Sequence, residues 1–113
     1  MPLPPLSASQ RAEALAKAAA ARARRAELRD RLKRSEESLA AILALGQDDE
    51  VVGRMRVSAL LQALPGIGRA RAAQIMERLG IAASRRVRGL GPRQREALVA
   101  EFDGWPGRRD RVT

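Results

Sequence analysis

The sequence predicts an all-α protein in which a long N-terminal helix precedes a compact helical domain with two tight turns. From about Ser9 to Lys33 the chain is rich in Ala, Arg, Leu and Glu and lacks Gly and Pro, so we expect one helix of roughly seven turns. After residue 35, short apolar segments with helical spacing alternate with turns that contain Gly or Pro. No segment requires a β-strand.

Composition limits the classes of function. The 113 residues suffice for one domain with a modest core. With no Cys and no His, the chain has no disulfide, no thiolate ligand and no imidazole, so we predict no metal, no cofactor and no catalytic residue. No apolar run approaches the roughly 20 residues that span a bilayer, and the N-terminus lacks a signal-peptide core. We therefore expect a cytoplasmic protein that binds neither a membrane nor a small-molecule substrate.

Positive charge is concentrated in one part of the chain. The net charge is +9, and residues 54 to 95 alone contain ten arginines against one acid, Glu77. That segment therefore carries an excess equal to that of the whole chain. A basic block of this kind on a folded domain predicts a polyanionic partner.

The N-terminal helix has few bulky apolar side chains. Three prolines exclude a helix start in residues 1 to 6, which we expect to be an extended arm, and Ser7 with Gln10 forms a capping-box pattern. Only Leu15, Leu28 and Leu32 offer apolar bulk. The helix should therefore pack on the body through its C-terminal third and project its N-terminal part.

One stripe of this helix is basic. Two interpretations of the stripe stay open: an arm that lies along a nucleic-acid backbone, or a solvated face held by pairs such as Glu27 with Arg31 at i and i+4. At about 100° per residue, the stripe contains Arg11, Arg22, Arg25, Arg29 and Lys33.

Two short helices follow. We expect Ser35 to end the long helix and to cap the next one, with Glu36 and Glu37 in its first turn and Gly46 at its end. The apolar residues of that helix that should face the core are Leu39, Ile42 and Leu43. The acidic residues 48 to 50 then cap a short third helix, because an EF-hand would need a twelve-residue ligand loop that is not present.

The segment from Leu64 to Gly68 should join a helix over residues 57 to 63 to a helix over residues 68 to 79. Gly66 and Gly68 allow a tight turn and leave backbone N–H groups bare, while Ile67 docks into the core. A helix N-terminus with unpaired N–H groups and a positive dipole end is a ready phosphate site. The alternative is an ordinary tight turn between two core helices. Arg69 and Arg71 follow in the first turn.

A second turn, Ile81 to Gly91, is also rich in arginine. Val87 can anchor it while Arg85, Arg86 and Arg88 point outward. Pro92 then opens a last helix that runs to about Phe102 with Arg93 at its start. Residues 104 to 113 show no periodicity and should form a frayed tail, and whether Trp105 packs back stays open.

Two resemblances follow from these residues. The pattern Leu64-x-Gly66-Ile67-Gly68-xxx-Ala72-xx-Ile75 resembles the helix-hairpin-helix motif of DNA-binding proteins without sequence specificity. Over about residues 3 to 102 the chain also resembles the actinobacterial type of integration host factor, a small nucleoid-associated protein. The segments that carry this resemblance are Ser9-Gln10-Arg11, residues 29 to 34, residues 57 to 61, Leu64-Pro65 and residues 85 to 91.

The second resemblance implies a helix-two-turns-helix core over residues 35–103 and a lid formed by the arm and long helix of residues 1–34, whereas the flexible tail expected at 104–113 departs from the family. It further implies binding of duplex DNA with little sequence preference, bending and compaction of DNA in the nucleoid, and help for phage integration, with a phage integrase as a further candidate partner. The arginines that contact DNA in this family match Arg85, Arg86 and Arg88.

We therefore expect the protein to bind the phosphate backbone of DNA without making sequence-specific contacts to the bases. The predicted DNA-binding groups are the hairpin N–H groups of Gly66, Ile67 and Gly68, the side chains of Arg69, Arg71, Arg85, Arg86, Arg88 and Arg93, and, on the long helix, Arg22, Arg25, Arg29 and Lys33.

Three other functions compete with this one. The main alternative is a ribosomal-type protein that binds structured RNA, although the basic block contains no aromatic residue for stacking on single strands. A DNA-repair glycosylase would need an amine nucleophile or an acid–base pair, and no Lys lies near the hairpin along the sequence. A coiled-coil partner helix is disfavoured because the long helix has no sustained heptad.

Overall fold

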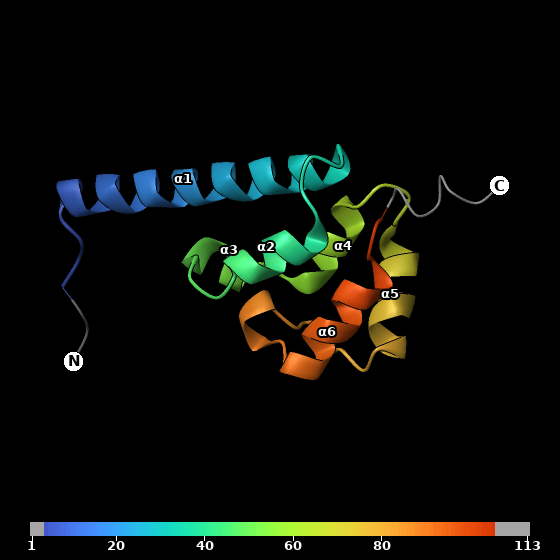
Figure 1. Cartoon of the computed structure of the whole chain (residues 1–113). Coiled ribbons are helices and arrows are strands. Elements are labelled where there is room, and N and C mark those ends of the chain that lie inside the picture. The colour runs from blue at the N-terminus through green and yellow to red at the C-terminus, as the bar shows by residue number, and fades with distance from the viewer. Residues whose placement is uncertain (1–3, 106–113) are drawn as a thin grey trace.

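The computed structural model describes residues 4–105 and is all-α, as predicted. Within residues 4–105 there is no β-strand, and no helix is both long and apolar enough to cross a membrane. Figure 1 shows α1 lying across the body of short helices, with its N-terminal part projecting beyond α3. The elements are α1 (Ala8–Lys33), α2 (Leu39–Leu45), α3 (Glu50–Arg54), α4 (Val57–Ala63), α5 (Arg69–Arg78), the 3₁₀ turn η1 (Val87–Gly89) and α6 (Pro92–Glu101).

The start and the packing of α1 follow the sequence prediction. Ser7 Oγ accepts a hydrogen bond from the Gln10 backbone N–H at 3.1 Å, and Gln10 Oε1 accepts one from the Ser7 N–H at 2.8 Å. Leu28 and Leu32 are buried, whereas Leu15 is 71% exposed. α1 is therefore packed on the body by its C-terminal third. Of the arm predicted at residues 1 to 6, residues 4 to 6 are exposed and not helical, and residues 1 to 3 lie outside the described residues.

One apolar core joins all the helices. The two buried leucines of α1 belong to the same cluster as the buried residues of the body, so the body and the end of α1 fold as one unit. Ala63, Leu79, Val99 and Trp105 pack against the cluster from its edge. Its members from the body are Leu39, Ile42, Leu43, Val52, Met55, Val57, Leu60, Leu61, Leu64, Ile67, Ala72, Ile75, Met76, Ile81, Val87, Leu90, Leu98 and Phe102.

The prediction that Ser35 caps the second helix is wrong. Ser35 has a φ of 61°, the left-handed conformation that ends α1, and the Glu36 N–H donates back to the Arg31 carbonyl at 2.9 Å. An N-cap residue needs an extended backbone, so one residue cannot serve both roles. Ser38 is the N-cap of α2, where its hydroxyl accepts from the Ala41 N–H at 3.1 Å.

Asp49 connects α3 to α1. Its carboxylate accepts from the N–H groups of Val51 and Val52 and pairs with Arg24 of α1 at 3.1 Å. The acidic cap predicted for the third helix is confirmed. The Val52 N–H and the Arg24 guanidinium hold the pKa of the Asp49 carboxyl below its usual value, although partial burial acts in the opposite direction.

We expect Asp49→Asn to lower the free energy of unfolding by about 0.5–1 kcal/mol at neutral pH, because it keeps a cap acceptor but loses the ion pair. Since the folded-state pKa lies below the unfolded value of 3.8, this contribution is complete above that value and disappears as the pH falls through the folded-state pKa. The melting temperatures of the wild type and of Asp49→Asn should therefore differ at about pH 7 and agree at about pH 2. Asp48→Asn, which alters an exposed neighbour, is the control, and an equal difference at both pH values would contradict the prediction.

Candidate nucleic-acid interface

The hairpin between α4 and α5 reverses the chain at Pro65 and Gly66. Gly66 has a φ of 79°, a conformation that requires glycine, and Ile67 is buried at 4% exposure, as predicted. The Ile67 N–H, however, donates to the Leu64 carbonyl at 3.1 Å. The prediction that this amide is available to a phosphate is therefore wrong, because the turn itself uses it.

The available amides lie one step further along the chain. Gly68 is the N-cap of α5, and the Ala72 N–H is the first that bonds within the helix, to the Gly68 carbonyl at 3.0 Å. No side chain among residues 4–105 caps this helix, so the N–H groups of its first turn remain open to an anion.

Gly68 is not required by the fold of the hairpin. Its φ of −90° is an ordinary extended conformation, and a Cβ built there would meet no described atom within 4 Å. The predicted common role of the two glycines is thus corrected: Gly66 makes the turn, whereas Gly68 leaves open space in front of the helix N-terminus.

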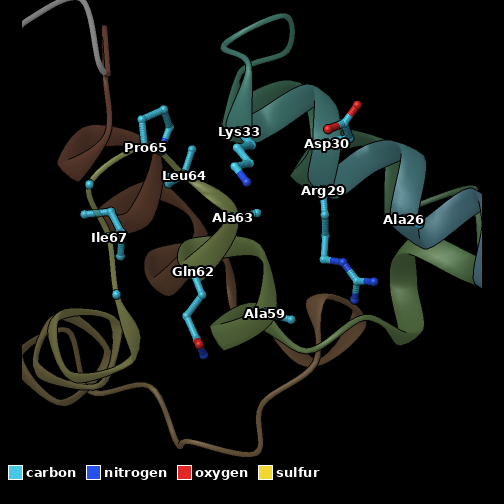
Figure 2. A pocket seen from close by; sticks show the side chains of 12 residues that line it. Ala26, Arg29, Asp30, Lys33, Ala59, Gln62, Ala63, Leu64, Pro65 and Ile67 are labelled. Atoms are coloured by element: carbon cyan, nitrogen blue, oxygen red, sulfur yellow. The ribbon is translucent and has the colours of Figure 1, made fainter.

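α1 supplies the opposite wall of an open groove of about 750 Å³ in front of the hairpin. Figure 2 shows the side chains of Arg29 and Lys33 extending from α1 into the space that faces Ile67 and Gln62. Asp30 also borders the groove, but its carboxylate points away from it (Figure 2) and pairs with Arg34 at 3.3 Å. The groove therefore combines two cationic side chains with the open helix N-terminus.

The other two predicted residues of α1 lie elsewhere. Arg25 lines a different groove, between α1 and α3, together with Val51 and Arg54. Arg22 is exposed and lies seven residues before Arg29, hence on the same face of α1 but about 10 Å nearer its N-terminus. The structure thus brings Arg29 and Lys33 to the hairpin and leaves Arg22 and Arg25 outside that groove.

The second turn is fastened to the beginning of α4. The Val57 N–H donates to the Arg85 carbonyl at 3.0 Å, and the Val87 N–H donates to the Met55 carbonyl at 2.9 Å. Between these bonds, Arg56 and Arg86 form an isolated antiparallel bridge. Val87 is buried at 4% exposure, which confirms its predicted role as the anchor of this turn.

Only two of the three arginines of this turn project as predicted. Arg85 folds back: its Nη1 donates to the Gly89 carbonyl at 3.0 Å, and its Nε is buried. Its predicted outward direction is wrong, because its guanidinium closes the turn in which it lies. Arg86 and Arg88 are exposed, although one nitrogen of Arg86 donates to the Arg54 carbonyl at 2.6 Å.

Arg56 is a candidate contact that the sequence reasoning missed. It is exposed, it is the N-cap of α4, and the bridge places it directly opposite Arg86. Like charges at opposed positions repel each other, so an anion between them would stabilise the pair. Arg56 also shares a face of α4 with Ala59 and Ala63, which line the hairpin groove, and that spacing of three and seven was readable in the sequence.

Three further predicted residues occupy helix starts. Arg69 and Arg71 are exposed in the first turn of α5, and Arg93 is exposed in the first turn of α6. Cations at a helix N-terminus oppose the dipole, which is a cost of a few tenths of a kcal/mol that a bound anion would offset.

Gly46 packs directly against Val87 of the second turn and leaves no room for a larger residue, because a Cβ at Gly46 would lie 2.4 Å from Val87 Cγ1. Gly46→Ala should therefore cost about 1–3 kcal/mol and lower the melting temperature by at least about 4 °C. Gly91→Ala is the matched control, since its added methyl would approach only the Gln94 side-chain oxygen, at 3.8 Å. Calorimetry of both variants measures the effect, and equal melting temperatures would mean that Val87 moves aside freely.

Comparison with known proteins identifies the family. Residues 32–102 match the S13-like H2TH domain. The chain is 60% identical over 102 residues to the Integration host factor of Streptomyces coelicolor, which covers 90% of this chain and 95% of that protein. It is 57% identical over 103 residues to the Integration host factor of Mycolicibacterium smegmatis, covering 91% and 98%. The chain belongs to the actinobacterial integration host factor family.

A solved structure of this integration host factor family shares the fold. The structure of sIHF bound to an 8bp palindromic DNA superposes with a TM-score of 0.75 at 59% identity, covering 76% of this chain and 97% of that one. The S13-like H2TH domain, called the family domain below, covers residues 32–102. Most of α1 therefore precedes the family domain, and Trp105 follows it.

Proposed function

We propose that this protein binds duplex DNA through the phosphate backbone, with little sequence preference. The observation that carries the proposal is the hairpin groove, in which the open N-terminus of α5 faces Arg29 and Lys33 of α1. Helix N-termini and basic side chains are the groups that proteins use to hold phosphates. The solved relative bound to an 8bp palindromic DNA supports the same partner.

The exposed arginines of the second turn form the other part of the proposed interface. α4 separates the two parts, with Arg56, Arg86 and Arg88 at its N-terminal end and the hairpin at its C-terminal end. A helix of seven residues is about 10 Å long, so the two parts would hold phosphates of different backbone segments. Arg22 and Arg25 would add contacts only where DNA follows α1 beyond the hairpin, and Arg93 only where it reaches α6.

A duplex fits this surface better than a single strand. The chain has no Tyr, one Phe and one Trp. Phe102 is buried in the core and Trp105 is half-buried. Single-strand binding uses exposed aromatic faces for base stacking, and this surface offers guanidinium and amide donors instead. Structured RNA remains the alternative ligand, and competition between it and duplex DNA discriminates the two.

The salt dependence of binding tests this proposal. If about six phosphates are neutralised, log K should fall with log salt at a slope near −5, so affinity should drop about a thousandfold between 50 and 200 mM. Gel shifts with several unrelated duplexes should give similar slopes and similar affinities. A slope near zero, or tighter binding of structured RNA, would contradict the proposal.

The cellular role that we propose is architectural. A non-enzymatic protein with two phosphate sites in one folded unit can bend and compact DNA in the nucleoid. The long helix α1 of the predicted lid segment (1–34) would cover the core of residues 35–103, and a phage integrase would be a further partner. Bending is measurable as faster ligation of a DNA fragment of about 100–150 bp into a circle, since that length is near the persistence length. Unchanged circle formation at saturating protein would contradict bending.

A further inference from the structure

Trp105 lies against the hairpin rather than in a frayed tail. Its Nε1–H donates to the Pro65 carbonyl at 3.0 Å, across 40 residues of chain. Its ring packs edge-to-face on Phe102, with 5.8 Å between centroids and an angle of 89°, and Phe102 belongs to the core. Residues 106 to 113 of the predicted tail lie outside the described residues.

The same ring holds Arg71. The Arg71 Cζ lies 5.5 Å from the Trp105 ring centroid, within the range of a cation–π interaction. Arg71 is exposed in the first turn of α5, where the helix dipole disfavours a cation. An exposed Arg side chain samples many rotamers, so contact with a fixed ring restricts it to a few. The ring therefore both offsets the unfavourable charge and orders the guanidinium.

Pro65 and Arg71, which Trp105 contacts, belong to the proposed phosphate site. Pro65 immediately precedes Gly66, the residue that makes the turn, and Pro65 also lines the hairpin groove. Arg71 lies three residues after Gly68, at the open helix N-terminus. Because Trp105 lies beyond the end of the family domain at residue 102, the segment after that domain supplies this support.

We propose that Trp105 is a positioning residue for DNA binding: it fixes the Pro65–Gly66 bend and orders Arg71 so that its guanidinium can reach a phosphate bound at the N-terminus of α5. The inference rests on the proposed function of the hairpin. Ordering a side chain before binding reduces the entropy lost on binding, so the effect should appear in DNA affinity and in the number of phosphates neutralised.

A double-mutant cycle in the full chain tests the inference. Trp105→Ala should weaken binding to a duplex by about five- to tenfold at low salt and reduce the salt slope by about 0.9, the value of one phosphate contact. Arg71→Ala should do the same, and adding it to Trp105→Ala should cost less than about twofold more. Trp105→Phe, which keeps a ring but loses the N–H donor, should fall between the wild type and Trp105→Ala.

Val99→Ala controls for a loss of stability, because Val99 packs at the edge of the same core and is not one of the residues that line the hairpin groove. It should lower the melting temperature without changing DNA affinity or the salt slope, when binding is measured at a temperature at which each variant is folded. A merely structural role for Trp105 would give this same pattern and would overturn the inference, as would equal effects of Arg71→Ala in both backgrounds.

Intrinsic fluorescence gives a second readout in the unmodified protein. The chain has one Trp and no Tyr, so emission comes from Trp105 alone. Titration with duplex DNA should change this emission with the same midpoint as the gel shift, and an unchanged emission at saturation would overturn the inference. If the wild type does not bind duplex DNA at all, the proposed function fails instead, so the two failures are distinguishable.

Discussion

Reversal of two arginines, Arg86→Glu with Arg88→Glu, should weaken binding to duplex DNA by more than about a hundredfold at 100 mM salt. Both side chains are exposed on the turn that Val87 anchors, and each reversal replaces a phosphate donor with a group that repels phosphate. The variant loses the exposed hydrogen bond from Arg86 to the Arg54 carbonyl, but it should stay folded, because the backbone bonds of this turn to Met55 and Val57 involve neither side chain. Gel shifts and helical circular dichroism measure the two effects.

The matched control changes the same charge at another place. Arg11 and Lys17 are exposed on the projecting part of α1 and lie outside the hairpin groove residues. Reversing both of them lowers the net charge equally and should weaken binding far less. Equal losses in the two double variants would mean that net charge alone, and not this surface, controls affinity.

Arg85 needs a separate test, because its guanidinium closes the turn. Arg85→Ala removes the hydrogen bond from the Arg85 side chain to the Gly89 carbonyl. The Arg85 side chain also packs closely on Gly89, since a Cβ at Gly89 would lie 3.1 Å from Arg85 Cδ. We therefore expect a loss of about 1 kcal/mol in stability from this substitution. In a triple variant that also changes Arg85, a loss of DNA binding would combine the effect of lower stability with the effect of lost phosphate contacts.

Gly68→Asp should have opposite effects on stability and on binding. Asp is a strong N-cap and favours the positive end of the helix dipole, so the free protein should gain about 0.5–1 kcal/mol and melt a few degrees higher. The space in front of Gly68 is open, and its backbone is already extended, so the side chain fits. Its carboxylate would then occupy the amides that we assign to a phosphate, and DNA affinity should fall by more than about thirtyfold.

Ser7→Asp is the control for this substitution. Ser7 caps the distant N-terminus of α1, so the variant keeps a helix cap and adds one negative charge far from the hairpin. Its DNA affinity should change by less than about threefold. If Gly68→Asp melts higher and still binds DNA like the wild type, the N-terminus of α5 is not a phosphate site.

Much of the fold was predictable because its signals are local. The capping box at Ser7 and the helix from Val57 to Ala63 both follow from a few adjacent residues, and the structure confirms each of them. The misplaced cap at Ser35 has a local cause too. Ser35 and Ser38 are equivalent cap candidates in composition, and only the backbone reversal at the end of α1 distinguishes them.

The candidate site was predictable in its residue types and not in its arrangement. The basic composition of residues 54 to 95 indicated a polyanion partner before any contact was known. The sequence did not indicate that the Ile67 amide and the Arg85 guanidinium are used inside their own turns, because both bonds depend on the final backbone path. It also gave no sign of Trp105 reaching the Pro65 carbonyl.

The sequence by itself determined most helix boundaries, though not the start of α2, and where positive charge accumulates, since caps, glycines, prolines and arginines act within one or two turns of their own position. Only the tertiary structure decided that Arg29 and Lys33 face the hairpin and that Arg56 lies opposite Arg86. It also decided that Trp105, which follows the family domain, donates a hydrogen bond to the Pro65 carbonyl in the hairpin. These juxtapositions join segments that are remote in the sequence. They are set by how apolar faces of several helices fit into one core, which no local propensity encodes.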